Sequence, residues 1–441
     1  MPEELARVDV LLDDERFFAP FVSFFHATHG RPSIPMETYL RLMFLKSRYK
    51  LGYESLCREV ADSISWQRFA RIPLGTRVPH PTTLMKITTR CGDAAVAGLN
   101  EALLAKAAEK QLLRTEKVRV DTTVVEADVA YPTDSGLLAK AIGTMAKTVN
   151  RIKADGAASR TAYRDRSRSA GKRARAIASK LRHRSAAGRD EALAVVRRIT
   201  GELADLAGRA ARDAHAVLRN ARRAAATATG HAQGRLKRAC AELAHTIELA
   251  DRIAAQTRLR LAGGKVDSAT RIVSLNDADA RPIRKGRLGK PVEFGYKAQV
   301  ADNADGVILD YTVDVGAPPD APMLAPAIER ITRIAGSAPR LVTADRGYGF
   351  ASVEHELREL GVDKVHVPRQ GKPGLARQQL EHTRAFRESV KWRTGCEGRI
   401  STLKRNHGWN RTHLTGIDGA RTWCGHGVLA HNLVKIAALG A

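Results

Sequence analysis

Apolar residues recur at helical spacing through the first part of the chain. A run of apolar positions between Pro35 and Gly52 predicts a helix from about Met36 to Tyr49. Ser55 is expected to cap a second helix that follows this one. Because the helical pattern continues, residues 1–110 are expected to form a compact helical domain with helix-turn-helix character.

A second pattern, in which β-branched residues are frequent and apolar positions alternate with polar ones, predicts strands on both sides of a long central segment. The expected strands are residues 117–126 before that segment, and residues 290–300 and 307–315 after it, the last two joined by a hairpin turn at 301–306. The later expected elements are a helix over 323–334, a strand over 340–344, a helix over 352–360, a strand over 364–367 and a helical region over 386–405. This order predicts an α/β fold with a mixed sheet.

The central segment, residues 137–264, combines helical periodicity with a strong positive charge. Apolar residues return at helical spacing at Leu193 and Val196 and again at Leu236 and Leu243, which predicts long amphipathic helices. The segment contains 28 Lys and Arg but 10 Asp and Glu, so it carries 18 of the 26 net positive charges of the 441-residue chain. Such a basic surface indicates a polyanionic partner, and nucleic acid is the first candidate. The alternatives are a solvated helical hairpin whose charge is incidental, and attachment to an anionic membrane surface.

Other features of the sequence indicate the cellular compartment of the protein. The sequence contains no stretch of about 18 uninterrupted apolar residues, so a membrane-spanning helix is not expected. The first five residues are acidic rather than basic, which argues against a secretory signal. The five cysteines are scattered and form no Cys-x-x-Cys pair, which argues against a disulfide framework and a zinc ribbon. We therefore expect a cytoplasmic protein with no membrane partner.

Three acidic residues lie on separate expected elements and are the candidates for chemistry. Asp121 lies inside the first strand, where a carboxylate is costly unless it is paired or binds a metal. Asp345 follows the strand over 340–344, and Glu397 lies in the last helical region. Taken singly, each is explained as a turn cap, a surface acid or a buried ion pair. Taken together, they fit phosphodiester transfer by two divalent ions, which uses carboxylates that converge from separate elements.

Four sequence blocks resemble the DDE transposases of bacterial insertion sequences, and together they span almost the whole chain. The blocks are residues 31–46 with 57–62 and 81–84, residues 120–126 with 131–138, residues 343–348, and residues 392–405. In the last block, Arg393, Glu397 and Lys404 meet the family's Arg-x3-Glu-x6-Lys spacing, whereas Val390 stands where the family often has Tyr. The chain is thus similar to the group with the Tyr-Arg-Glu-Lys signature and to ISNCY-like elements.

This resemblance implies an RNase H-like core built on a mixed sheet. Residues 1–110 would be a helical N-terminal domain for DNA binding and dimerisation. Residues 111–136 and 265–441 would form the catalytic domain. Residues 137–264 would be a large basic helical insertion between the first and second core strands.

The resemblance also implies an activity and a set of site residues. The catalytic residues, which would also hold two Mg²⁺ (or Mn²⁺) ions, are Asp121, Asp345 and Glu397. The residues expected to contact DNA are Arg393, Arg399, Lys404 and Arg405. The protein would bind the terminal inverted repeats of its insertion sequence, cut by metal-dependent hydrolysis to give 3′-OH ends, and join these ends to target DNA. It would act as a homodimer or larger assembly on double-stranded DNA in the bacterial nucleoid.

Two alternatives keep the fold but change the function. One is a regulatory DNA-binding relative without activity, against which the intact Asp121, Asp345 and Glu397 argue. The other is an RNase H-like nuclease or resolvase that cuts without joining. The helical N-terminal region and the basic insertion favour recognition of transposon ends over that alternative.

Overall fold

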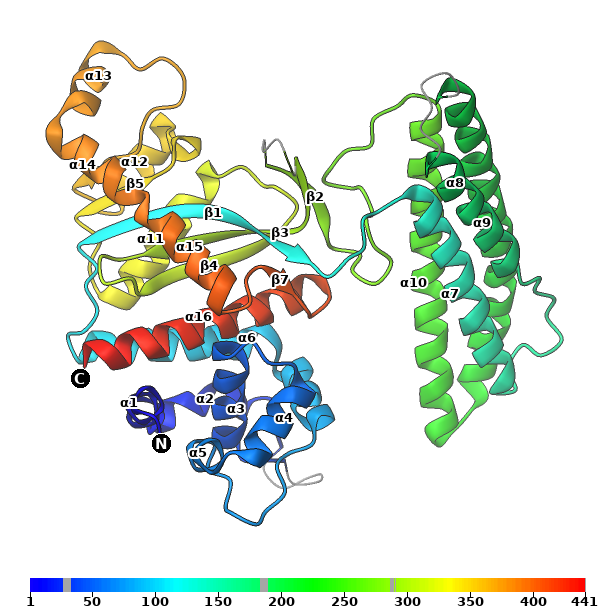
Figure 1. The fold of residues 1–441 in the computed structure, drawn as a ribbon, viewed down its shortest axis with the longest axis horizontal. Helices are drawn as coiled ribbons and strands as arrows, with labels where there is room; N and C mark the ends of the chain where they lie inside the picture. The colour runs from blue at the N-terminus through cyan, green and yellow to red at the C-terminus, as the bar shows by residue number, and fades with distance from the viewer. Residues whose placement is uncertain (27–32, 183–188, 286–288, 290, 441) are drawn as a thin grey trace. The chain divides into compact units, whose positions relative to one another are not determined.

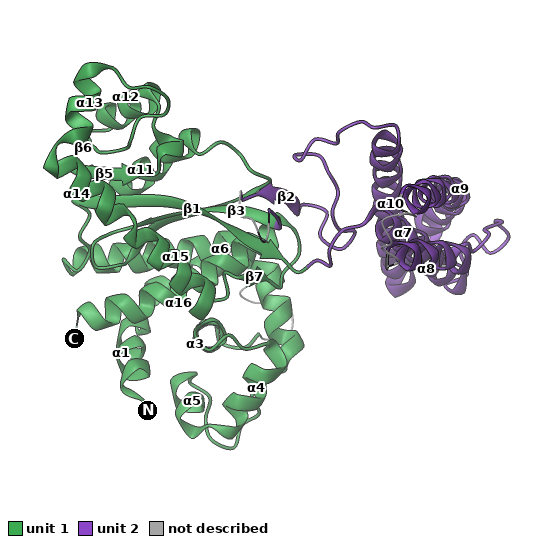
Figure 2. Ribbon diagram, turned by 45° about the horizontal axis from the view of Figure 1, so that its top comes forward, with its two compact units in different colours: residues 1–128, 295–441 green, residues 129–294 purple. Residues whose placement is uncertain are grey.

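A computed structural model describes residues 1–26, 33–182, 189–285, 289 and 291–440. The chain divides into two compact units, which Figure 2 shows in different colours. The first unit consists of Met1–Asp128 and Gly295–Ala441, and the second of Val129–Phe294.

Helices make up the N-terminal part of the first unit. They are α1 (Glu3–Leu12), the short η1 (Glu15–Phe17), α2 (Ala19–Val22), α3 (Met36–Arg48), α4 (Tyr53–Asp62), α5 (Ile64–Phe69) and α6 (Pro81–Glu109). The helix predicted from about Met36 is confirmed as α3. The predicted cap at Ser55 is wrong, because α4 already begins at Tyr53 and Gly52 is its N-cap. The buried positions Leu56 and Cys57 belong to a helix that starts earlier than the polar Ser55 indicated.

A mixed sheet lies at the centre of the first unit. Its strands are β1 (Lys117–Ala127), β3 (Val292–Asp302), β4 (Ile308–Val315), β5 (Leu341–Ala344), β6 (Lys364–Val365) and β7 (Arg411–Thr412), whereas the short β2 (Arg281–Arg284) belongs to the second unit. The order in the first unit is β3-β1-β5-β6, with β4 beside β3 and β7 beside β1. β1 is antiparallel to β3 and parallel to β5, and β5 is parallel to β6. The expected mixed α/β fold with a helical N-terminal region is therefore confirmed.

The helices after the sheet's hairpin are α11 (Ala321–Ala335), α12 (Ala351–Glu359), α13 (Leu375–His382), α14 (Arg384–Arg393), α15 (Gly395–Asn406) and α16 (Gly416–Leu439). The single helical region predicted over 386–405 is in fact two helices, which separate at Thr394. The sequence pattern did not predict α16, because glycines at its start and two buried histidines weaken the apolar periodicity.

One hydrophobic core joins the N-terminal helices to the sheet. Leu42 of α3, Leu99 of α6, Val120 of β1 and Leu433 of α16 all belong to it. Figure 1 shows α16 running along α6, and α16 also packs against α3. The last helix of the chain therefore completes the core that the first helices begin. The proposed division into separate N-terminal and catalytic domains stays a prediction.

The second unit contains a bundle of long helices with its own core. They are α7 (Asp134–Ala154), α8 (Ser167–Arg182), α9 (Arg189–Thr227) and α10 (Gly230–Leu261), which run side by side in Figure 1. Its core is rich in alanine, so the helices approach closely. Thr133 caps α7, since its hydroxyl accepts the Gly136 N–H at 3.1 Å. The neighbouring Asp134 pairs with Arg260 at 2.6 Å.

Two further expectations concern the setting of the protein. Over the residues that the structure describes, no helix is long and apolar enough to cross a membrane. All five cysteines are buried and unpaired, which agrees with the expected lack of a disulfide framework.

Candidate active site

The register of the sheet places the two candidate aspartates next to each other. β1 and β5 are parallel, and Val120 on β1 lies beside Ala344 on β5. The next residues along the two strands are Asp121 and Asp345. Neighbouring strands lie about 4.8 Å apart, so the two backbones carry their carboxylates at adjacent positions. This site lies where β5 ends, which is where open α/β sheets commonly build sites.

Each aspartate is held locally by a backbone N–H group. The Asp121 carboxylate accepts the N–H of Thr122 at 2.8 Å and is half-buried. The Asp345 carboxylate accepts the N–H of Arg346 at 2.7 Å and caps the short turn after β5. Asp345 is exposed to solvent.

Glu397 reaches the same region from the first turn of α15. The buried residues of this helix are Cys396, Ile400 and Leu403. The Cys396 thiol lies 3.8 Å from the carbonyl oxygen of Val300 on β3, so this face of α15 is packed on the sheet. Glu397 follows Cys396 on the outer side, and its side chain is 64% exposed.

Arg393 connects two of the three acids. Its Nη1 lies 2.8 Å from Oδ2 of Asp121, and its Nη2 lies 3.3 Å from Oε1 of Glu397. Arg393 is on the last turn of α14, one turn before Glu397, so a single side chain spans from α14 to both β1 and α15. The predicted catalytic residues Asp121 and Glu397 are thus brought to one cation.

The three carboxylates influence one another electrostatically. Burial raises the pKa of Asp121 to about 6, and the charges of Asp345 and Glu397 contribute in the same direction. The Thr122 N–H and the Arg393 guanidinium oppose this rise, but they do not cancel it. A site of this kind favours a bound cation, because a cation relieves the repulsion among its acids.

The donor set has the chemistry that a divalent ion needs. Carboxylate oxygens are the hard ligands that Mg²⁺ prefers. In the part of the chain that the structure describes, no group of three or more His, Cys, Asp or Glu side chains is arranged to hold a metal ion. The Arg393 guanidinium contacts the oxygens of both Asp121 and Glu397. Coordination by these two acids therefore requires that the guanidinium move away.

The other predicted DNA contacts lie along α15. Arg399 is turned inward, where its Nε lies 3.2 Å from Oδ2 of the buried Asp302. Lys404 is half-buried and Arg405 is exposed, both in the last turn of the helix. The structure thus places Arg393 among the acids and Arg399 against Asp302, while Arg405 faces solvent.

Sequence reasoning missed Arg119 and Asp302, which lie directly behind the candidate site. Arg119 pairs with Asp302 through two hydrogen bonds of 2.7 and 2.9 Å. The sequence spacing could have indicated Arg119, because it stands two residues before Asp121 and the two side chains therefore leave β1 on the same face. A charged residue inside a β-branched strand needs a partner, and that partner lies on β3.

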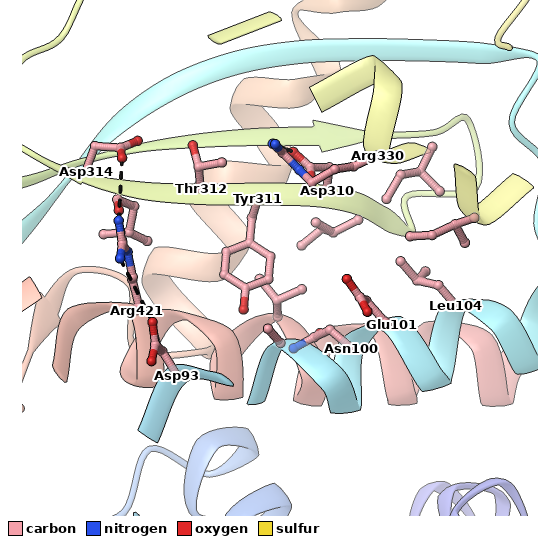
Figure 3. A pocket seen from close by; sticks show the side chains of 16 residues that line it. Asp93, Asn100, Glu101, Leu104, Asp310, Tyr311, Thr312, Asp314, Arg330 and Arg421 are labelled. Carbon is pink, nitrogen blue, oxygen red and sulfur yellow. Dashed lines mark hydrogen bonds and ion pairs between the residues drawn. The ribbon is translucent and has the colours of Figure 1, made fainter. Parts of the chain in front are cut away.

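A separate cavity of about 320 Å³ lies between α6, β4, α11 and α16 (Figure 3). Its charges are already paired: Arg330 binds Asp310 at 2.7 and 2.8 Å. Arg421 lies 3.8 Å from Asp314 and 4.0 Å from Asp93. None of the candidate catalytic residues lines this cavity, so it is distinct from the carboxylate site.

Two models of known families match parts of the chain. Residues 1–90 match a family described as a transposase domain (DUF772), and residues 266–433 match a family described as a transposase DDE domain. Asp345 and Glu397 fall inside the second match, and Asp121 lies between the two. No curated protein and no solved structure matches the chain. Transposases with a DDE domain typically use divalent metal ions, act on DNA and catalyse polynucleotidyl transfer. The chain, with its DUF772 N-terminal region and its DDE catalytic domain, is a DDE transposase.

Proposed function

We propose that this transposase binds the terminal inverted repeats of its own insertion sequence, cleaves at their ends to leave 3′-OH groups, and joins these ends to target DNA. The observation that carries the proposal is the register of β1 and β5, which sets Asp121 beside Asp345, together with the Arg393 bridge from Asp121 to Glu397. Both steps are phosphodiester transfers, so one carboxylate site serves them both.

In this proposal, the acidic and the basic side chains of the site have different roles. Asp121, Asp345 and Glu397 would hold two Mg²⁺ or Mn²⁺ ions, which supply activation of the attacking hydroxyl and neutralise the leaving oxygen. Arg393 would leave the carboxylates and present its two N–H groups to a DNA phosphate. Lys404 lies seven residues after Glu397, about 10 Å along the same helix, and would contact the backbone further on.

The charge distribution of the second unit supports a role for this unit in binding the DNA duplex. Residues 214–241, which form the end of α9 and the start of α10, contain no Asp or Glu. They contain six exposed cations: Arg219, Arg222, Arg223, Arg235, Lys237 and Arg238. Among the described residues, only Arg235 has an acidic partner, Asp155 at 3.5 Å. Such unpaired charge is available for phosphates.

Several cations elsewhere in the bundle are paired with acids of the second unit. Arg258 pairs with Asp205 at 3.1 Å, and Arg260 pairs with Asp134 at 2.6 Å. The acid-free segment 214–241 is therefore the part of the second unit that we assign to the DNA backbone. Since two transposon ends must be held together for joining, we propose that two or more copies of the chain act on the DNA.

The test uses the full-length protein, Mg²⁺ and a labelled duplex that ends in the element's terminal repeat. Wild-type protein should release a 3′-OH end and then form a product joined to target DNA. Asp121→Asn should lose both products while it still binds the duplex. Glu126→Gln, a change of an acid on the same strand at an odd offset from Asp121, is the matched control and should keep both.

Each alternative gives a different result in this assay. Cleavage without any joined product would indicate a nuclease or resolvase. Specific binding without cleavage in Mg²⁺ or Mn²⁺ would indicate a regulatory relative. Full activity of Asp121→Asn would overturn the assignment of the carboxylate site.

A further inference from the structure

We infer that Arg119, Asp302 and Arg399 form a buried charge clamp that positions Glu397 and Arg393 against the strand that carries Asp121. These three residues are called the Asp302 clamp below. The inference rests on the proposed function of the carboxylate site. It gives Arg399 a positioning role in place of the DNA contact expected from the sequence.

The clamp is centred on a carboxylate with no exposure to solvent. Asp302 is 0% exposed at the end of β3, beside Arg119 in the antiparallel register of β1 and β3. Arg119 holds it with a planar pair of hydrogen bonds, Nε to Oδ1 at 2.7 Å and Nη2 to Oδ2 at 2.9 Å. Arg399 adds a third bond, from Nε to Oδ2 at 3.2 Å. A carboxylate that accepts hydrogen bonds from two guanidinium groups holds both of them, because the buried carboxylate has no water to bond to in their place.

The clamp connects β1, α14 and α15, the elements that carry Asp121, Arg393 and Glu397. Arg119 lies two residues before Asp121 on β1. Its Nη1 donates to the carbonyl oxygen of Trp392 at 2.9 Å, and its guanidinium lies over the Trp392 ring, 4.7 Å from the ring centre. Trp392 directly precedes Arg393. Arg399 lies two residues after Glu397. The end of α14 and the first turn of α15 are therefore both tied to Asp302.

Two glycines make room for the clamp. A Cβ atom at Gly395, the first residue of α15, would collide with the guanidinium of Arg119. A Cβ atom at Gly306, in the turn between β3 and β4, would collide with the guanidinium of Arg399. Gly306 also has a φ of +80°, which other residues adopt at a cost. Because Asp302 holds both guanidinium groups in place, neither can move aside cheaply to accept a larger residue.

The two roles for Arg399 predict different measurements. A phosphate contact contributes to the salt dependence of DNA binding, with a slope of about 0.9 in log K against log salt for each contact. A positioning residue leaves that slope unchanged and lowers the rate of the chemical step. The decisive variant is therefore Arg399→Gln, examined by duplex binding at several salt concentrations without divalent ions, and by single-turnover cleavage with Mg²⁺.

We expect Arg399→Gln to keep the wild-type affinity and salt slope but to cleave at least tenfold more slowly at saturating DNA. Arg399→Lys should recover much of the rate, because Arg399 reaches Asp302 through a single N–H group. Arg119→Lys should cleave slowly although it keeps the charge, because a lysine cannot make the paired bonds to Asp302 and the bond to Trp392 together. Gly395→Ala should slow cleavage in the same way without altering the slope.

A positive control and a folding control make the result interpretable. Arg405→Gln, an exposed position on the same helix, should lower the slope by about 0.9 if α15 lies on the duplex. Circular dichroism and thermal melting identify any variant that is not folded, and the remaining clamp variants then carry the test. A lower slope and weaker binding for Arg399→Gln, with a normal rate at saturation, would overturn the clamp. If wild-type protein binds DNA but does not cleave it, the proposed function fails, while the slope still decides whether Arg399 contacts DNA.

Discussion

At the scale of single residues, the candidate site is a set of three acids, two of which are bridged by one arginine. Arg393 contacts Asp121 and Glu397, and the pKa of Asp121 is nevertheless raised to about 6 by burial and by the neighbouring acids. The guanidinium therefore stands where a metal cation would be favourable. A side chain in this position competes with the metal and must move when the metal binds.

This competition predicts that Arg393→Ala binds metal more tightly in the absence of DNA. Removing one cation from among the acids should lower the Kd for Mn²⁺ by about tenfold, which corresponds to ~1.4 kcal/mol. The same variant should cleave more slowly, because it has lost its phosphate contact. Isothermal titration with Mn²⁺ measures the first effect, and Arg387→Ala, an exposed arginine on the same helix, is the control. Weaker Mn²⁺ binding by Arg393→Ala would contradict the competition.

A second residue-scale prediction concerns pH and stability. Burial lowers the pKa of His407 from its ordinary value of 6.5 to about 4. Between these pH values the unfolded chain binds a proton that the folded protein does not, so the free energy of unfolding falls as the pH is lowered from 6.5 to 4. The loss from His407 is about 3 kcal/mol.

The measurement is urea unfolding of the wild type and His407→Met at pH 7, 6, 5 and 4. The variant should lose less stability over this range than the wild type. His355→Gln changes an exposed histidine and should follow the wild type. Parallel curves for the wild type and His407→Met would show that His407 titrates normally in the folded state.

At the scale of elements, the end of the α9–α10 hairpin over residues 214–241 is a basic surface that contains no Asp or Glu. Replacing Arg219, Arg222 and Arg223 by Gln should lower the salt slope of DNA binding by about 2.7, since each phosphate contact contributes about 0.9. The matched control replaces Arg173, Arg198 and Arg258, which are paired with acids in the same bundle. That control removes the same charge but should change the slope much less. Equal slopes for the two triple variants would show that the hairpin end has no special role.

Periodicity explains which elements could be predicted from sequence. β1, β3 and β4 were predicted within two residues of their ends, because β-branched and alternating residues mark strands that are long or half-buried. The end of α14 at Thr394 could not be predicted, since the hydrophobic pattern continues through Cys396 and Ile400. The break lies at a close tertiary contact, because a Cβ atom at Gly395 would collide with the guanidinium of Arg119.

The candidate site was predictable only in part. The types and order of Asp121, Asp345 and Glu397 are visible in the chain, but their proximity depends on the pairing of β1 with β5, which no local pattern specifies. The position of Arg399 could not be predicted either. Its exposure could not be judged from sequence, because its partner Asp302 lies 97 residues away.

At the scale of the whole molecule, the second unit is a sequence insertion in the first, between two strands that pair with each other. Glu126 on β1 and Gly295 on β3 are partners in an antiparallel ladder, so the chain leaves and returns at adjacent positions. Replacing residues 128–293 by a two-residue Asn-Gly turn should therefore leave a folded first unit with a short hairpin. Its melting should remain cooperative, whereas its affinity for DNA should fall and depend less on salt. A molten product would show that the first unit needs the second to fold.

The position of α16 has a consequence for how the protein is made. β1 leaves the ribosome long before β3, and at 5–20 residues per second the delay is roughly 10 to 30 s. The second unit has its own core and can fold during this time. The core of the first unit cannot close during this time, since α16 packs on α3 and α6 and is synthesised after the other described helices. A ribosome that stops before α16 therefore releases a chain in which the core of the first unit is not closed.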